Sequence, residues 1–92
     1  MKLTRPTDFE ILDALSEGRR NVAANIAIEI DKERGYVNTR LPVLADYQLV
    51  KKVGPTSNSG LYEITRRGLA VLHLNEEYGE VEGVLNELEN KS

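Results

Sequence analysis

Three side chains with strong hydrogen-bonding capacity are adjacent near the middle of the sequence, at Asn38, Thr39 and Arg40. An arginine can donate two hydrogen bonds to O6 and N7 of guanine, and an asparagine amide can pair in the same way with adenine. Thr39 can meet a phosphate or the methyl group of thymine, and Val43 can contact that methyl too. On the outer face of a helix, these four residues would be able to read base edges in a major groove. The alternative is an exposed helix start at which Asn38 is only a cap.

Basic and polar residues elsewhere in the chain could contact the phosphate backbone, which positions a protein on a duplex without specifying sequence. Lys51 and Lys52 are neighbours in one predicted strand. Because side chains alternate across a strand, only one of the two is expected to face such a partner. Residues 56–59, which we predict to form the tip of a polar loop, include no cation and are suited to hydrogen bonds with phosphate. The candidates for backbone contact are Arg19, Arg20, Lys51, Lys52, Ser57, Asn58, Ser59, Arg66 and Arg67.

The net charge of −3 does not favour a nucleic-acid partner, but its distribution matters more than its sum. Residues 69–92 alone carry −5, so the chain before them is mildly basic. A positive face can therefore coexist with a negative total.

The composition argues against an enzyme and against a metal or cofactor site. The sequence has no cysteine and a single histidine, His73, which we place as a partly buried face residue of a helix. A solvated helix face explains the acidic residues near the C-terminus better than acid–base chemistry does, because no nucleophile or second ligand type lies nearby. These residues are Glu76, Glu77, Glu80, Glu82, Glu87 and Glu89. No apolar run is long enough to span a membrane, and we expect a cytoplasmic protein.

Hydrophobic periodicity predicts two helices before the central triplet. The first covers about residues 7–17, with Phe9, Leu12 and Leu15 on its apolar stripe. The second begins after Asn21 as N-cap and runs to about residue 33, with Gly35 as its left-handed C-cap. The connector between the two has room for a stub of strand.

A short third helix is predicted to begin between residues 36 and 39 and to bury Val37, Leu41 and Leu44. Pro42 favours this late start, because proline is tolerated only in the first turn of a helix. Residues 49–53 and 61–64 then read as two strands joined by a polar loop.

Thr65 is expected to cap a fourth helix that runs to about residue 78, with Leu69, Val71 and Leu72 as its apolar set. We divide the chain into a domain at residues 1–76 and an acidic amphipathic segment at 77–92. The apolar stripe of that segment needs a partner, either a second copy of the chain or the first helix. The stripe consists of Val81, Val84, Leu85 and Leu88.

Two phrases of the sequence carry a family resemblance, RLPVLADYQLVKKVG and GLYEITRRGLAVL. The second resembles the exit from the wing in the multiple-antibiotic-resistance and related archaeal regulators. Taken together with SNSGLYEIT, the two segments resemble the phage-repressor-like winged-helix proteins of haloarchaea. The resemblance covers about residues 7–76 and departs from the pattern at Gln48, where many relatives carry glycine, and at Pro42.

This resemblance implies an α+β, mainly helical, winged helix-turn-helix fold with a three-helix core, a two-stranded β-wing and a C-terminal helix. It also implies a repressor-like transcription regulator that binds double-stranded DNA selectively, and we expect a homodimer. The alternative is a winged-helix module that contacts protein or RNA without recognising an operator.

Overall fold

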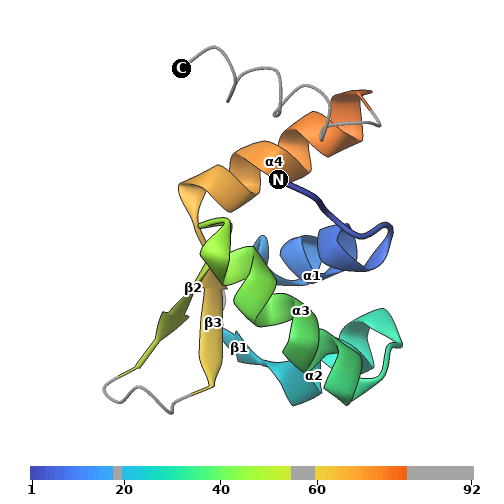
Figure 1. Cartoon of the computed structure of the whole chain (residues 1–92), viewed down its shortest axis with the longest axis vertical. Coiled ribbons are helices and arrows are strands. Elements are labelled where there is room, and N and C mark those ends of the chain that lie inside the picture. The colour runs from blue at the N-terminus through green and yellow to red at the C-terminus, as the bar shows by residue number, and fades with distance from the viewer. Residues whose placement is uncertain (18–19, 55–59, 79–92) are drawn as a thin grey trace.

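The computed structural model describes residues 1–17, 20–54 and 60–78, with the side chains of 77 and 78 left out. Its elements follow the order helix, short strand, two helices, two strands and a closing helix (Figure 1). They are α1 (Thr7–Leu15), β1 (Asn21–Val22), α2 (Ala23–Ile30), α3 (Arg34–Asp46), β2 (Val50–Val53), β3 (Leu61–Ile64) and α4 (Arg66–Tyr78). This is the predicted mainly helical α+β winged-helix fold.

The strands form one antiparallel sheet in the order β1-β3-β2. Tyr62 of β3 lies opposite Asn21 on one side and Lys52 on the other, so these three side chains share a face of the sheet. Tyr62 is buried, which shows that this face is turned towards the helices. Glu63 and Lys51 lie opposite each other on the other face. The predicted stub of strand is present, although it occupies Asn21 and Val22, and Asn21 is therefore not a helix cap.

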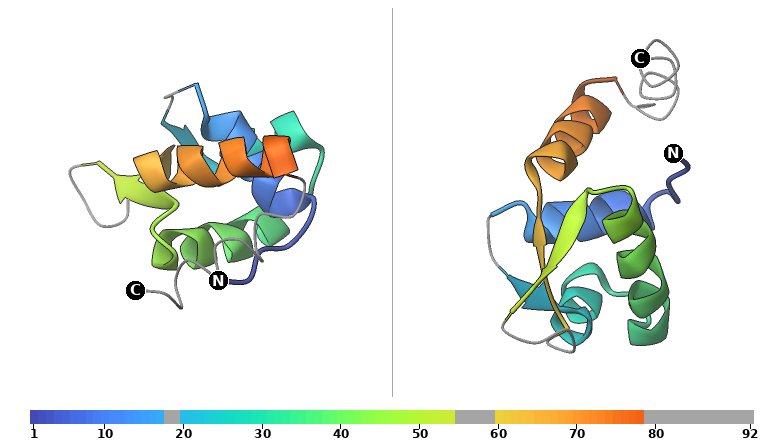
Figure 2. Two further views of the ribbon diagram at one scale, coloured as in Figure 1. Left: turned by 90° about the horizontal axis from the view of Figure 1, so that it is seen from above. Right: turned by 60° about the vertical axis from the view of Figure 1, so that its left-hand side comes forward.

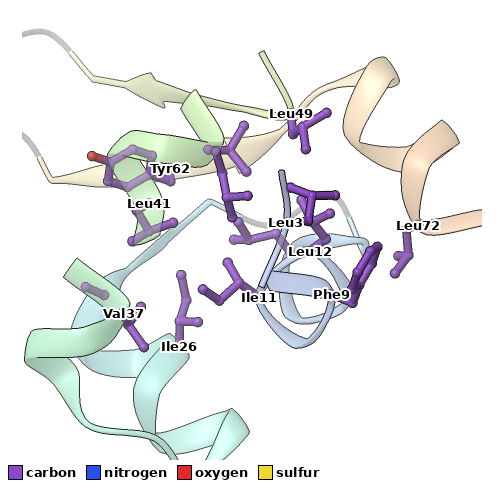
Figure 3. Packing of buried hydrophobic residues seen from close by; sticks show 14 of the residues in the cluster. Leu3, Phe9, Ile11, Leu12, Ile26, Val37, Leu41, Leu49, Tyr62 and Leu72 are labelled. Atoms are coloured by element: carbon purple, nitrogen blue, oxygen red, sulfur yellow. The ribbon is translucent and has the colours of Figure 1, made fainter. Parts of the chain in front are cut away.

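The core lies where α1, α2, α3 and the first turns of α4 meet the inner face of the sheet (Figure 3). The predicted stripe of α1 is confirmed, since Ile11, Leu12 and Leu15 are fully buried. The rest of the buried apolar set is Leu3, Phe9, Ala23, Ile26, Ala27, Val37, Leu41, Leu44, Leu49, Val50, Tyr62, Val71 and Leu72. Its members come from both ends of the described chain, so the N-terminal segment and α4 close the same core.

The predicted boundary between α2 and α3 is wrong. Helix α2 ends at Ile30, and Asp31 takes the left-handed conformation, with φ 56°, that we had assigned to Gly35. An aspartate tolerates this conformation better than most residues because its short polar side chain can bond locally. The N–H of Lys32 donates to the carbonyl of Ala27 over 3.0 Å and completes the turn.

Helix α3 therefore starts at Arg34 and keeps Pro42 well inside it, contrary to the late start that the proline predicted. Pro42 has no N–H for the carbonyl of Asn38, and an interior proline is costly. Its side chain points to solvent, however, and the buried residues Val37, Leu41 and Leu44 hold the helix on both sides of it. Tertiary burial thus outweighs the local preference.

The chain leaves α3 through Gln48, whose φ of 63° lies in the left-handed region that favours glycine. Thr65 caps α4 as predicted, since its hydroxyl accepts the N–H of Gly68 at 3.0 Å. The same hydroxyl donates to the carbonyl of Gln48 over 2.6 Å, which ties the start of α4 to the turn after α3. Two expectations for α4 are wrong, because Leu69 is 42% exposed and His73 is exposed. Val71 and Leu72 are buried in the core, and Leu74 packs against it partly buried.

Candidate nucleic-acid interface

The outer side of α3 carries most of the residues expected to read bases. Asn38 and Thr39 are exposed and Val43 is half-buried, on the side away from the buried Val37 and Leu41. The hydroxyl of Thr39 donates to the carbonyl of Tyr36 over 2.6 Å, one turn back along the helix. Its methyl group and both lone pairs of its hydroxyl oxygen are still available to a partner. The longer helix adds a further turn to this surface, before the residues that the sequence assigned to it.

A hollow of about 380 Å³ separates the first half of α3 from the sheet. Arg34 and Asn38 line it from α3, four residues apart and so on one face of the helix, and Lys52 faces them from β2. The hollow is also lined by Val22, Ala23, Ala24, Gly60 and Tyr62. The right-hand view of Figure 2 shows the sheet on one side and α3 on the other, at the end of the molecule where β1 leads into α2. Two cations and an amide thus converge on one concave surface, a combination suited to a phosphate backbone.

The two neighbouring lysines of β2 point to opposite faces of the sheet, as alternation predicts. The ammonium of Lys52 lies 6.0 Å from the centre of the Tyr62 ring, at the hollow. On the other face, Lys51 Nζ lies 3.1 Å from Glu63 Oε1, and Arg20 Nε lies 3.1 Å from Glu63 Oε2. Hydrogen bonds from Lys51 and then Arg20 lower the pKa of Glu63. One carboxylate therefore binds two of the cations expected to contact a backbone.

Arg40, predicted to read bases, instead binds a buried carboxylate of α1. Its Nε lies 2.9 Å from Asp8 Oδ1, and its Nη2 lies 2.8 Å from Oδ2. Asp8 is 0% exposed, and the side chain of Arg40 is only 18% exposed. The hydrogen bond to Asp8 raises the pKa of Arg40, against the opposing effect of burial. Asp8 thus takes up two N–H groups of a side chain that is mostly buried, so Arg40 is less available to a base than the exposed Asn38 and Thr39, and its base-reading role stays a prediction.

The remaining backbone candidates are not gathered at the hollow. Arg66 and Arg67 are exposed at the start of α4, which follows the C-terminal end of β3 (Figure 1). Arg19 and the loop residues Ser57, Asn58 and Ser59 lie outside the described residues. So does the candidate dimer stripe of Val81, Val84, Leu85 and Leu88.

Two residues, Arg34 and Asp8, have a greater part than the sequence predicts. Arg34 lines the hollow, although it precedes the helix start that the sequence predicts. Its spacing of four from Asn38 would reveal it once α3 is known to start there. The burial of Asp8 has no local signal, because an aspartate in the first turn of a helix reads equally well as an exposed residue that favours the helix dipole.

Among the described residues, no cluster of three or more histidine or acidic side chains could hold a metal ion. Within the same part of the chain, no helix has the length and apolar character needed to cross a membrane.

Comparison with solved structures supports the fold and places it near one class of regulators. ZitR of Lactococcus lactis, in complex with DNA, is similar at 26% identity and a TM-score of 0.68 over 100% of this chain. A mutant of ZitR in apo form is similar at 24% identity and a TM-score of 0.62, covering 95% of this chain and 68% of that one. The oxidised form of MarR from E. coli gives 17% identity and a TM-score of 0.60, covering 91% of this chain and 72% of that one.

The chain is thus structurally similar to MarR-family winged-helix transcription regulators. This agrees with the resemblance to the multiple-antibiotic-resistance regulators, whereas the resemblance to haloarchaeal phage repressors is not supported. The chain spans 64% of the length of the DNA-bound ZitR chain. No protein-family model matches the sequence, and no curated protein does either.

Proposed function

We propose that the protein is a transcription regulator that binds double-stranded DNA selectively, with α3 in the major groove and the sheet beside it. The carrying observation is the hollow between α3 and β2, where Arg34, Asn38 and Lys52 converge next to the exposed outer side of α3. A helix fits the major groove, and the cations that flank it would meet the phosphates. That ZitR, which is similar in fold, was solved in complex with DNA supports DNA as the partner.

Within this proposal, Asn38 and Thr39 read base edges and Val43 contacts a thymine methyl. Arg34 and Lys52 bind phosphates at the hollow. Arg40 is left out of the reading set because Asp8 holds its guanidinium. Arg20 and Lys51 are bound to Glu63 on the other face of the sheet, and Arg66 and Arg67 lie at the start of α4, so none of these four cations lines the hollow.

A salt series tests this function on duplexes that the wild-type protein selects from a random library. Each phosphate neutralised by a side chain contributes about 0.9 to the slope of log affinity against log salt. We therefore expect Arg34→Ala and Lys52→Ala each to make the slope shallower by about 1. Lys2→Ala is the matched control, since it removes an exposed cation at the other end of the molecule. A wild-type slope near zero would contradict the proposal.

The base-reading part has its own test. Replacing Asn38 with alanine should relax the preference at one base pair, by about 1–3 kcal/mol, and leave the salt slope unchanged. Sequencing of the duplexes retained by wild type and by Asn38→Ala measures this directly. Uniform loss of affinity for all sequences would mean that Asn38 contacts only the backbone.

We also propose that the regulator is a homodimer whose two recognition helices meet half-sites about one helical turn apart. The support is the stripe of Val81, Val84, Leu85 and Leu88, which needs an apolar partner. Sedimentation of the full chain should give a dimer, and the double substitution Val84→Asp with Leu88→Asp should give a folded monomer. A dimer that survives both substitutions would exclude this segment as the interface.

One observation favours the second candidate, a module that contacts protein or RNA. The outermost line of α3, formed by Gly35, Thr39, Pro42 and Asp46, is exposed and contains no cation. Competition separates the two functions, because duplex DNA should displace a bound partner only if both use the surface at Arg34 and Lys52.

A further inference from the structure

The contact between Asp8 and Arg40 joins the start of α1 to the middle of α3. Both oxygens of the carboxylate accept from the guanidinium, and Oδ2 also accepts the backbone N–H of Thr4 at 2.7 Å. The carboxylate lies in the first turn of α1, where the helix dipole favours a negative charge. Every part of this buried charge is therefore compensated, which is the condition under which an ion pair persists inside a protein.

The same N-terminal segment holds α3 at a second point. The N–H of Lys2 donates to the hydroxyl of Tyr47, directly after the last residue of α3, over 3.1 Å. Between the two contacts, Leu3 is buried in the core. The N-terminal residues thus reach α3 at two points, its middle through Asp8 of α1 and its C-terminal end through Lys2.

These polar contacts differ in kind from the apolar packing of the helix. Val37, Leu41 and Leu44 bury one side of α3, but apolar burial is not directional and allows small rotations. A guanidinium that makes two parallel bonds to a carboxylate fixes direction as well as distance. Because Arg40 follows Thr39 and Asn38 directly, a rotation that broke the pair would also turn those side chains away from their places.

We propose that Asp8 and Arg40 form a positioning pair, which fixes the rotation of α3 so that Asn38 and Thr39 face the DNA. The pair does not itself touch the bases. This inference rests on the proposed function. It adds a cause for the selectivity among DNA sequences, namely a contact on the flank of α3 that faces α1 and not the DNA. Asp8 on α1 then contributes to sequence recognition from inside the protein.

A double-mutant cycle on the full chain distinguishes positioning from direct reading. The variants are Asp8→Asn, Arg40→Met and the two together, with Arg40→Lys as the conservative replacement that keeps the charge but loses the paired N–H groups. Binding is measured to the duplex selected by the wild type and to a random duplex, with the folded fraction checked by circular dichroism and the active fraction by titration. Any variant that is partly unfolded is compared with the wild type at a lower temperature, at which both are folded.

If the pair positions α3, Asp8→Asn and Arg40→Met should each lower affinity for the selected duplex by about 10- to 100-fold, similar to the loss from one mismatched base pair. The double variant should be no worse than either single variant, because the second change removes nothing further. The salt slope and the affinity for random duplex should stay as in the wild type, and Arg40→Lys should recover only part of the loss.

Direct reading by Arg40 gives the opposite pattern and would overturn the inference. In that case Asp8→Asn, which frees the guanidinium, would bind the selected duplex as tightly as the wild type or more tightly, and only Arg40→Met would lose affinity. Equal losses on selected and random duplexes would overturn it as well. Failure of the wild type to bind any duplex with a salt-dependent affinity would instead overturn the proposed function, and the inference with it.

Discussion

Arg34 and Arg40 lie within two turns of the same helix, yet their surroundings differ in every respect. Arg34 is exposed and lines the hollow that Lys52 faces from the sheet. Arg40 lies on the flank of the helix that faces α1, and its guanidinium is bound by a carboxylate with no exposed surface. The comparison teaches that the type of a residue in this helix does not define its role. Its angle around the helix axis decides whether it meets solvent or a neighbouring element.

The largest expected effect is on the free energy of unfolding when the two arginines are truncated. Arg40→Met leaves the buried carboxylate of Asp8 without its partner, and we expect a loss of about 3–5 kcal/mol. Arg34→Met, the matched control, should change stability by less than about 0.5 kcal/mol. Urea denaturation of both variants measures the difference. Equal losses would mean that the two arginines do not differ as their surroundings indicate.

Two glycines extend the comparison to the backbone. A β-carbon on Gly68 would collide with the carbonyl oxygen of Leu49 and with Ile64, whereas nothing lies close to Gly35. Gly68→Ala should therefore cost about 3 kcal/mol. Gly35→Ala should stabilise the protein by about 0.5–1 kcal/mol, because alanine has the higher helix propensity. Thermal unfolding monitored by circular dichroism should move in opposite directions for the two variants, and a shift of the same sign would break this contrast.

Two threonines test the same distinction on a smaller scale. The hydroxyl of Thr65 caps α4 and bonds the turn after α3, so Thr65→Ala should destabilise the fold by about 1 kcal/mol. The hydroxyl of Thr39 bonds only a carbonyl of its own helix, at the surface. Thr39→Ala should leave stability within about 0.5 kcal/mol of the wild type while it weakens discrimination among duplexes. If Thr39→Ala destabilises the fold as much as Thr65→Ala does, the side chain of Thr39 has a role in stability and not only in recognition.

The smallest effect concerns Glu63, which binds Lys51 and Arg20 on the outer face of the sheet. Because these hydrogen bonds lower its pKa, the glutamate stabilises the fold at pH values above its ordinary pKa. That contribution is lost as the pH falls through the lowered value. Unfolding midpoints between pH 6 and pH 3 should therefore depend on pH less steeply for Glu63→Gln than for the wild type. Curves that run parallel would show that the two cations are not bound through Glu63 in solution.

Local pattern predicted most of the fold. The stripe of α1, the two strands of the wing and the cap at Thr65 all follow from short-range spacing, and each is present. The largest errors in helix bounds fall at the turn between α2 and α3, where Gly35 and Pro42 both mislead. Asp31 adopts the left-handed conformation expected of Gly35, and Pro42 remains inside a helix that is held by burial on both sides.

The candidate site was predicted only in part, because local pattern indicates which residues of a helix are exposed but not which distant residues they contact. The exposure of Asn38 and Thr39 follows from helical periodicity alone. The pairing of Arg40 could not be predicted, because its partner lies 32 positions earlier in the sequence, where Asp8 has no local signal of burial.

The sequence by itself determined the winged-helix architecture and the helix that presents polar side chains, since periodicity, caps and turn residues act over a few positions. Only the tertiary structure decided which cations are available to a partner. Asp8 binds Arg40, Glu63 binds Lys51 and Arg20, and Arg34 and Lys52 converge at the hollow. These outcomes depend on contacts between residues far apart in the chain, which no local pattern encodes.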